Sequence, residues 1–186
     1  MPHKKTVSII AAVRTKEEFE QALCSDVDIV FDLNPDILSL IGRVQSAHAS
    51  SKKIFIHMDL AEGIGKDKHG IMFAKKIGVD GIISTRVSII KTAREAGLFT
   101  VQRFFIVDSQ SISTTIESFK SSRPNMIEIM PGIVTKAIRI LRSKTDIPII
   151  AGGLIDTEEE ISEALKCGIS AVSTGKQEFW FNRKDI

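Results

Sequence analysis

The amino-acid sequence predicts an α/β protein, a compact single-domain (β/α)8 TIM-like barrel with parallel strands, on three observations. Short apolar runs rich in β-branched residues recur eight times along the 186 residues. Amphipathic segments separate most of these runs, and strict alternation of strand and helix requires a parallel sheet with helical crossovers. Eight repeats match the strand number of a closed barrel. No Pro-, Gly- or Ser-rich stretch divides the chain, so residues 1–186 are expected to form one domain, with residues 1–6 as a short N-terminal tail.

Each apolar run is short enough to be a buried strand. The expected strands begin near Val7, Asp28, Lys53, Gly81, Phe99, Met126, Ile147 and Ala171. About 23 residues per unit is lean against the roughly 31 of a typical barrel, which leaves no room for an inserted lid domain. An open doubly wound sheet would alternate in the same way and remains the alternative. No G-x-G-x-x-G turn follows the first run, which favours the barrel.

Six segments between these runs carry helical patterns. They are TKEEFEQALC after a Thr15 cap, DKHGIMFAKKIG, SIIKTAREAG, SQSISTTIESFKSS, IVTKAIRILRSKT and DTEEEISEALKCG. Several open with Asp, Ser or Thr, whose side-chain oxygens accept hydrogen bonds from the first turn, and close with Gly. Near the C-terminus, EFWFN is expected to be a last helix whose Phe179, Trp180 and Phe181 plug the barrel.

The composition predicts a globular cytoplasmic protein. Hydrophobic residues make up 43% of the chain and charged residues 26%, which is ordinary for a globular domain. Because no apolar run reaches the length of a membrane span and MPHKKTVSIIAAVR lacks a cleavage site, we expect neither membrane association nor secretion. Cys24 and Cys167 are expected to be buried thiols, since two distant cysteines form no disulfide framework. Nothing in the sequence indicates the oligomeric state.

Charge is distributed unevenly along the chain, although the net charge is only +2. Residues 60–145 hold 14 Lys and Arg against 7 Asp and Glu, a local charge of +7. The remaining residues hold 11 against 16, a charge of −5. The middle of the chain is therefore the part expected to meet a polyanion, if there is one.

Two of the expected strands end in residues with little or no side chain. The seventh ends at Gly152 and Gly153, and the eighth at Ser173, Thr174 and Gly175. In barrels the C-terminal strand ends form the binding face, and a phosphate commonly lies between the loops after strands seven and eight. Glycine lets backbone N–H groups approach an anion closely. The pattern predicts a phosphate-binding site, although Gly-Gly alone is also explained by a tight strand-to-helix turn.

Polar side chains at other expected strand ends would contact the rest of a ligand. His57 and Asp59 share one face of the third strand, and Arg86 follows the fourth. Arg103 lies inside the fifth strand and Glu128 inside the sixth. A charge inside a barrel strand is costly unless it is paired, so we expect Arg103 to pair with Glu128 or Asp59. Such a pair serves either the ligand or the structure alone.

The sequence carries no signature of a metal, cofactor or covalent catalyst. His3, His48 and His69 form no H-x-H or H-x-x-x-H spacing. Neither a G-x-S-x-G nucleophile turn nor a P-loop occurs. We therefore expect no metal, no cofactor and no catalytic residue.

Five motifs appear in order along nearly the whole chain: HMDLAEGI, GIISTR, QRFFIVDSQS, IEIMPGIV and IPIIAGGLI. With them the sequence, from about Ile10 to Trp180, resembles the glycerol-3-phosphate-responsive antiterminator family, bacterial regulators of the glycerol uptake operon. The resemblance implies a small barrel that binds glycerol 3-phosphate as its effector. It also implies action on the leader of the operon messenger, by preventing termination or stabilising the transcript. The shared segments fall on His57, Asp59, Arg86, Arg103, Glu128, Pro131, Gly132, Gly152 and Gly153, and Ser173-Thr174-Gly175 match in character.

Two further hypotheses remain open at this point. A small phosphosugar or phosphotriose enzyme would use Asp59 or Glu128 as general base, because carboxylates at barrel strand ends suit that chemistry. A binding protein that recruits another protein instead of RNA is also compatible with the sequence. Since no RNP, KH or dsRNA-binding motif is present, the motifs do not show how RNA would be contacted.

If RNA is the partner, its phosphates are expected to meet a basic helix face. In IVTKAIRILRSK the expected buried stripe is Ile133, Ala137, Ile140 and Leu141. Lys136, Arg139 and Arg142 are then the RNA-binding candidates. The alternative is an ordinary solvated basic face.

Overall fold

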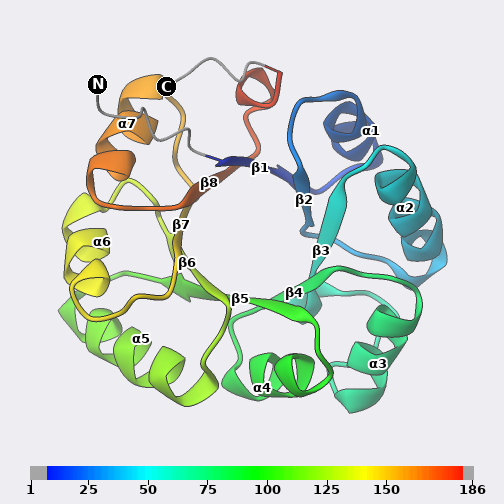
Figure 1. Ribbon diagram of the computed structural model, residues 1–186, viewed down its shortest axis with the longest axis horizontal. Coiled ribbons are helices and arrows are strands. Elements are labelled where there is room, and N and C mark those ends of the chain that lie inside the picture. The colour runs from blue at the N-terminus through cyan, green and yellow to red at the C-terminus, as the bar shows by residue number, and fades with distance from the viewer. Residues whose placement is uncertain (1–7, 182–186) are drawn as a thin grey trace.

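The computed structural model describes residues 8–181, which form a closed barrel of eight parallel strands (Figure 1). Strand order follows chain order, and β1 pairs with β8 to close the ring. The predicted (β/α)8 barrel is therefore confirmed, and the open doubly wound sheet is wrong. The expected tail, residues 1–6, and the expected strand start at Val7 lie outside the described residues. The strands are β1 (Ser8–Val13), β2 (Ile29–Asp32), β3 (Lys53–His57), β4 (Gly81–Ser84), β5 (Phe99–Phe105), β6 (Met126–Met130), β7 (Ile149–Gly152) and β8 (Ala171–Thr174).

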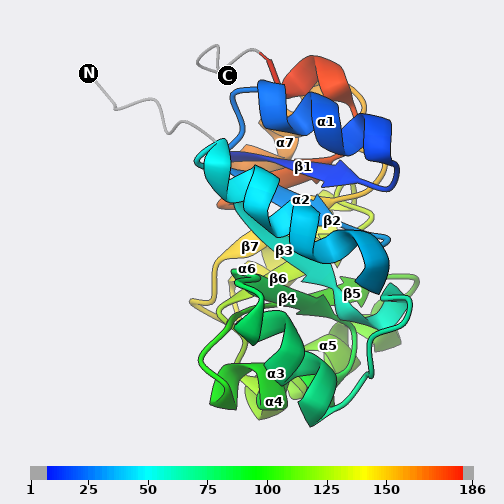
Figure 2. The ribbon, with the colours of Figure 1, turned by 90° about the vertical axis from the view of Figure 1, so that its right-hand side faces the viewer.

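Helices surround the strands as an outer ring, and the side view shows α1, α2 and α3 along one flank (Figures 1 and 2). They are α1 (Lys16–Cys24), α2 (Ile37–Ala49), α3 (Lys68–Lys76), α4 (Val87–Glu95), α5 (Ser109–Ser122), α6 (Thr135–Arg142) and α7 (Glu158–Lys166), with 3-10 turns η1 (Met58–Leu60) and η2 (Gln177–Phe179). Within residues 8–181, no helix has the length and apolar character needed to cross a membrane.

Side-chain caps set the starts of several helices, as the sequence predicts. The Thr15 hydroxyl accepts from Glu18 N–H, and the Glu18 carboxylate accepts from Thr15 N–H, which completes a capping box at α1. Thr157 and Glu160 form the same arrangement at α7. The Thr15 cap is confirmed.

α2 was not predicted as a helix. Asp36 caps it by accepting from Leu38 N–H, and its inner face buries Leu40 and Val44. Leu38 is 93% exposed and Ile41 47% exposed, so apolar residues lie on both faces of the helix. This distribution blurs the helical period and hides the helix from a pattern search.

The expected last helix is, within the described residues, only the single turn η2. Trp180 nevertheless acts as the plug, because it is 1% exposed and its Nε1–H donates to the Thr174 carbonyl at 3.0 Å. Phe181 is 40% exposed and does not join it. The expectation of two buried thiols is wrong for Cys24, which is exposed at the end of α1, whereas Cys167 is buried.

The barrel interior changes from apolar to polar along the strands. Ile10, Phe31, Phe55, Val101 and Ile150 belong to the apolar cluster that fills its N-terminal part. Inward positions alternate along a strand, so the residues two places further on face the same interior at the C-terminal end. Two places after Phe55 and Val101 lie His57 on β3 and Arg103 on β5. Ser173 on β8 follows Ala171 of the same cluster in the same way, and Glu128 on β6 is paired with Arg103 in the strand register. Polar chemistry is thus concentrated at the C-terminal mouth.

Candidate functional site

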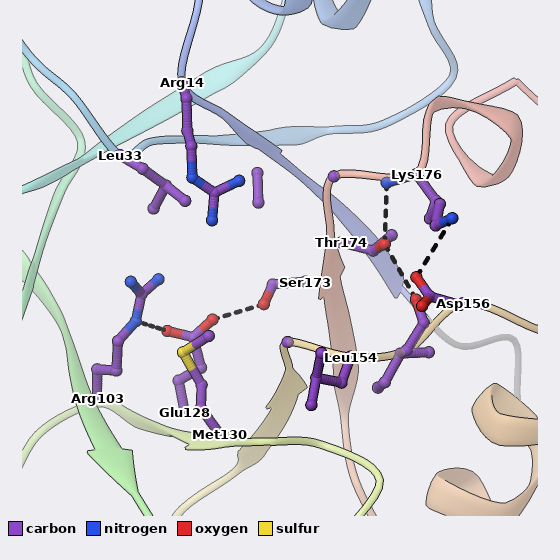
Figure 3. Close-up of a pocket in the computed structure, with 14 residues that line it drawn as sticks. Arg14, Leu33, Arg103, Glu128, Met130, Leu154, Asp156, Ser173, Thr174 and Lys176 are labelled. Atoms are coloured by element: carbon purple, nitrogen blue, oxygen red, sulfur yellow. Dashed lines mark hydrogen bonds and ion pairs between the residues drawn. The ribbon is translucent and has the colours of Figure 1, made fainter.

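The C-terminal mouth of the barrel holds a pocket of about 240 Å³ (Figure 3). Pockets for drug-sized ligands have roughly 300–1,000 Å³, so this volume suits a smaller molecule. The lining residues come from the ends of β1, β2, β5, β6, β7 and β8. They are Ala12, Arg14, Leu33, Arg103, Glu128, Met130, Gly153, Leu154, Ile155, Asp156, Ser173, Thr174, Gly175 and Lys176.

A buried ion pair forms the floor of the pocket. The β5–β6 register places Arg103 beside Glu128, and Arg103 Nε donates to Glu128 Oε2 at 2.6 Å. The Ser173 hydroxyl donates to Glu128 Oε1 at 2.5 Å, so both carboxylate oxygens are engaged. Of the two partners expected for Arg103, Glu128 and Asp59, it is Glu128 that pairs with it. The terminal guanidinium nitrogens of Arg103 extend away from Glu128 into the pocket (Figure 3).

The two glycines after β7 have different roles. A Cβ on Gly152 would lie 2.5 Å from Ser173 Oγ and 2.7 Å from Glu128 Oε1, so Gly152 makes room for the polar floor and does not line the pocket. Gly153 lines the pocket at φ +70, and a Cβ there would lie 2.7 Å from Met130 Cε. Both positions thus have a packing reason to be glycine. Gly153 remains a predicted phosphate contact, together with Ser173, Thr174 and Gly175, which line the same pocket.

Asp59 and Arg86 lie outside this pocket, at the ends of β3 and β4. Asp59 accepts from Thr85 N–H and Ser84 Oγ at 2.7 Å each and from Thr85 Oγ1 at 2.8 Å, and Arg86 Nε is 3.6 Å away. Burial works to raise the pKa of Asp59, but these hydrogen bonds outweigh it and hold the pKa below its usual value. The Asp59 carboxylate is therefore ionised and already saturated by the β4–α4 turn.

His57 is the last residue of β3 and is not among the residues that line the pocket. Its side chain is 4% exposed, and Nδ1 has no hydrogen-bond partner among the described residues. Burial lowers the pKa of His57, and the nearby Arg103 charge lowers it further against the opposing effect of Asp59 and Glu128. His57 is thus a neutral imidazole at pH 7.

We expect the protein to lose stability on acidification because of His57. Its folded pKa lies below the ordinary 6.5, so the unfolded chain takes up the proton first as the pH falls. The free energy of unfolding should drop by at most about 1.4 kcal/mol per pH unit below pH ~6.5 for this one proton. Urea denaturation at pH 7.5, 6.5 and 5.5 measures this. His57→Gln should flatten the dependence, and the wild type is the reference. Equal pH dependence in His57→Gln and the wild type would contradict the assignment.

Two cations at the pocket were missed by sequence reasoning. Arg14 directly follows β1, and Lys176 directly follows Gly175. Their position at the C-terminal ends of strands was the available signal. Among the described lining residues, Arg14, Arg103 and Lys176 oppose Glu128 and Asp156, which leaves the pocket with one net positive charge.

The basic helix α6 differs from its predicted arrangement. Its buried residues are Ala137, Ile138 and Leu141. Ile133 is 41% exposed because it precedes the helix start at Thr135, and Ile140 is half-buried at a groove between α5 and α6. The predicted stripe was therefore wrong at both isoleucines and omitted Ile138.

Of the three RNA-binding candidates, two have the accessibility that RNA contact requires. Lys136 and Arg139 are exposed. Arg142 is half-buried, and its Nη1 donates to the Thr145 carbonyl at 2.9 Å. Arg142 is thus at least partly engaged in holding the chain that leads to β7.

Comparison with known proteins identifies the family. A sequence profile described as "Glycerol-3-phosphate responsive antiterminator" matches residues 9–180. The "Uncharacterized protein YgcP" of Escherichia coli K12 is 36% identical over 96% of this chain and 94% of that protein. A solved glycerol uptake operon antiterminator regulatory protein from Listeria monocytogenes is 32% identical, with TM-score 0.89 over 97% of each chain. A glycerol uptake operon antiterminator-related protein from Thermotoga maritima is 34% identical, with TM-score 0.84 over 94% of this chain and 98% of that one.

More distant barrels share the fold alone. Orotidine 5'-phosphate decarboxylase from Pyrococcus horikoshii is 15% identical, with TM-score 0.71 over 89% of this chain and 88% of that one. The family assignment rests instead on the profile, which spans nearly all of the described residues. The chain belongs to the glycerol-3-phosphate responsive antiterminator family.

Proposed function

We propose that this protein is a transcription antiterminator that responds to glycerol 3-phosphate and acts on the leader mRNA of a glycerol uptake operon. Family membership supports the regulatory role, and both of the more similar solved structures are described in terms of the glycerol uptake operon. The observation that carries the ligand is the small pocket at the mouth, which has a net positive charge and exposes the turn after β8. These features suit a short phosphorylated polyol.

The proposed ligand lies with its phosphate toward the loops after β7 and β8. Gly153 and Gly175 bring bare backbone to that side of the pocket, and Lys176 adds a charge there. The hydroxyl end then lies over the floor, where the free guanidinium nitrogens of Arg103 are available as donors. Effector binding of this kind requires no metal and no cofactor.

We propose sensing without turnover, against the alternative of a phosphosugar or phosphotriose enzyme. A general base needs a carboxylate or imidazole that can reach the substrate proton. Glu128 has both oxygens engaged by Arg103 and Ser173, and Asp59 accepts three hydrogen bonds away from the pocket. Neither carboxylate is poised to exchange protons with a bound ligand.

Binding of leader RNA is the test of this function. The measurement is fluorescence anisotropy of labelled leader RNA with and without glycerol 3-phosphate, at two salt concentrations. Each single-strand phosphate contact contributes about −0.7 to the log–log salt slope, so Lys136→Gln/Arg139→Gln should flatten the slope by about 1.4. Glycerol 3-phosphate affinity should be unchanged in this variant, because neither residue lines the pocket.

The matched control is Lys16→Gln/Lys53→Gln, which makes the same charge change at exposed sites on α1 and β3. Its salt slope should change less than that of the α6 variant. If leader RNA does not bind at low salt even with glycerol 3-phosphate present, direct RNA recognition is lost. A protein partner then becomes the better hypothesis.

A further inference from the structure

Arg14 presents a guanidinium group to the pocket that has no partner among the described residues. Its guanidinium group extends into the pocket across from that of Arg103 (Figure 3). Its backbone N–H donates to Glu18 Oε2 at 2.5 Å, so the capping box of α1 holds the residue in place. A guanidinium has five N–H donors, and within residues 8–181 no hydrogen bond or ion pair engages those of Arg14.

The other cations of the pocket have acidic partners. Arg103 donates Nε to Glu128 at 2.6 Å, and Lys176 Nζ lies 3.5 Å from Asp156 Oδ1. Glu128 and Asp156 thus offset two of the three positive charges. The net positive charge of the pocket therefore resides at Arg14.

Bare backbone lies directly beside this guanidinium. Apart from its chain neighbours, a Cβ built on Gly175 would have two atoms of the described residues 8–181 within 4 Å, the Ala12 carbonyl oxygen at 3.5 Å and Arg14 Nη1 at 3.9 Å. The pocket side of the turn after β8 is therefore open next to Arg14. An anion placed there contacts the guanidinium and the glycine backbone together.

We propose that Arg14 recognises the phosphoryl group of the ligand, which lies between its guanidinium and the backbone of Gly175. A guanidinium can donate two parallel N–H hydrogen bonds to two oxygens of one phosphate. The ammonium group of lysine cannot make this paired contact. The ligand class is a phosphate monoester of a short polyol, whose hydroxyls extend toward Arg103. Its identity as glycerol 3-phosphate rests on the function proposed above, whereas the role of Arg14 rests on the pocket geometry.

Isothermal titration calorimetry of the full chain tests this proposal with three probes: glycerol 3-phosphate, inorganic phosphate and glycerol. Arg14→Gln should raise the dissociation constant for glycerol 3-phosphate roughly 10- to 100-fold, the range for a lost hydrogen-bonded charge. Arg14→Lys should fall between Gln and the wild type, because it keeps the charge without the paired donors. Lys16→Gln, two residues away and exposed on α1, should bind as the wild type does.

Gly175→Ala tests the backbone half of the site. The added Cβ meets its nearest neighbour at 3.5 Å, an ordinary contact, so the fold should tolerate it. The methyl group occupies the space assigned to the phosphate, and affinity should fall at least about 10-fold. Thermal denaturation of each unliganded variant checks that the fold is kept.

The outcomes separate this proposal from the proposed function. If the wild type binds glycerol 3-phosphate and both Arg14 variants bind it equally well, the role of Arg14 is overturned while the ligand stands. If the wild type binds inorganic phosphate through Arg14 but not glycerol 3-phosphate, the ligand is wrong and Arg14 stands. Binding of neither phosphate compound overturns both.

Discussion

Arg103→Met is expected to lower the free energy of unfolding by about 3–5 kcal/mol, because it leaves a charged carboxylate buried without its partner. The side chains of Arg103 and Glu128 are 7% and 0% exposed, so the pair is largely withdrawn from solvent. Ser173 remains as a single neutral donor to Glu128 Oε1. Methionine retains much of the aliphatic length of arginine, which limits the cavity contribution. Urea denaturation at pH 7 measures the change.

The double variant Arg103→Met/Glu128→Gln isolates the charge effect. Removing both charges should restore part of the lost stability, since breaking a buried pair costs more than removing it. Lys166→Met is the matched surface control, because it breaks an exposed pair with Glu163 that has the same 2.6 Å separation. That change should have little effect, since solvent screens exposed pairs. A single variant as stable as the double variant would show that Glu128 does not depend on Arg103.

Trp180→Ala is expected to destabilise the protein by a similar amount, about 3–5 kcal/mol for a truncated buried aromatic. Trp180 is 1% exposed and packs in the larger apolar cluster between the strands and α1–α4. Its Nε1–H donates to the Thr174 carbonyl at 3.0 Å, and its own carbonyl accepts from Asp26 N–H at 2.9 Å. The residue therefore ties the end of β8 to the turn after α1. Thermal denaturation followed by circular dichroism measures the loss.

Trp180→Ala should also weaken ligand binding, because Trp180 holds the backbone of Thr174, and Thr174 lines the pocket. Trp180→Phe keeps a buried aromatic ring and loses the indole N–H with part of the ring volume, so it should cost less than Trp180→Ala. Phe181→Ala changes the neighbouring aromatic, which is 40% exposed, and should have a small effect. If Trp180→Ala and Phe181→Ala are equally stable, Trp180 is not the plug of the barrel.

The barrel and its polar floor are predictable from the sequence. The eight expected strand starts lie within two residues of the described strands, apart from Val7, which falls outside the described range. Local hydrophobic pattern and cap residues carry this information, since both act over a few neighbouring positions. The Arg103–Glu128 pair was also predictable, because charges inside adjacent barrel strands need partners.

Which strand-end residues share a pocket follows from the packing of the closed barrel. His57, Asp59 and Arg86 occupy strand ends as well, yet none of them lines the pocket. Asp59 accepts its hydrogen bonds from the β4–α4 turn, and His57 is buried. Arg14 carries no motif, and it becomes a site residue because β1 closes the ring beside β8. Such pairings depend on contacts between segments more than a hundred residues apart. Neither periodicity nor capping contains that information, and packing of the closed barrel supplies it.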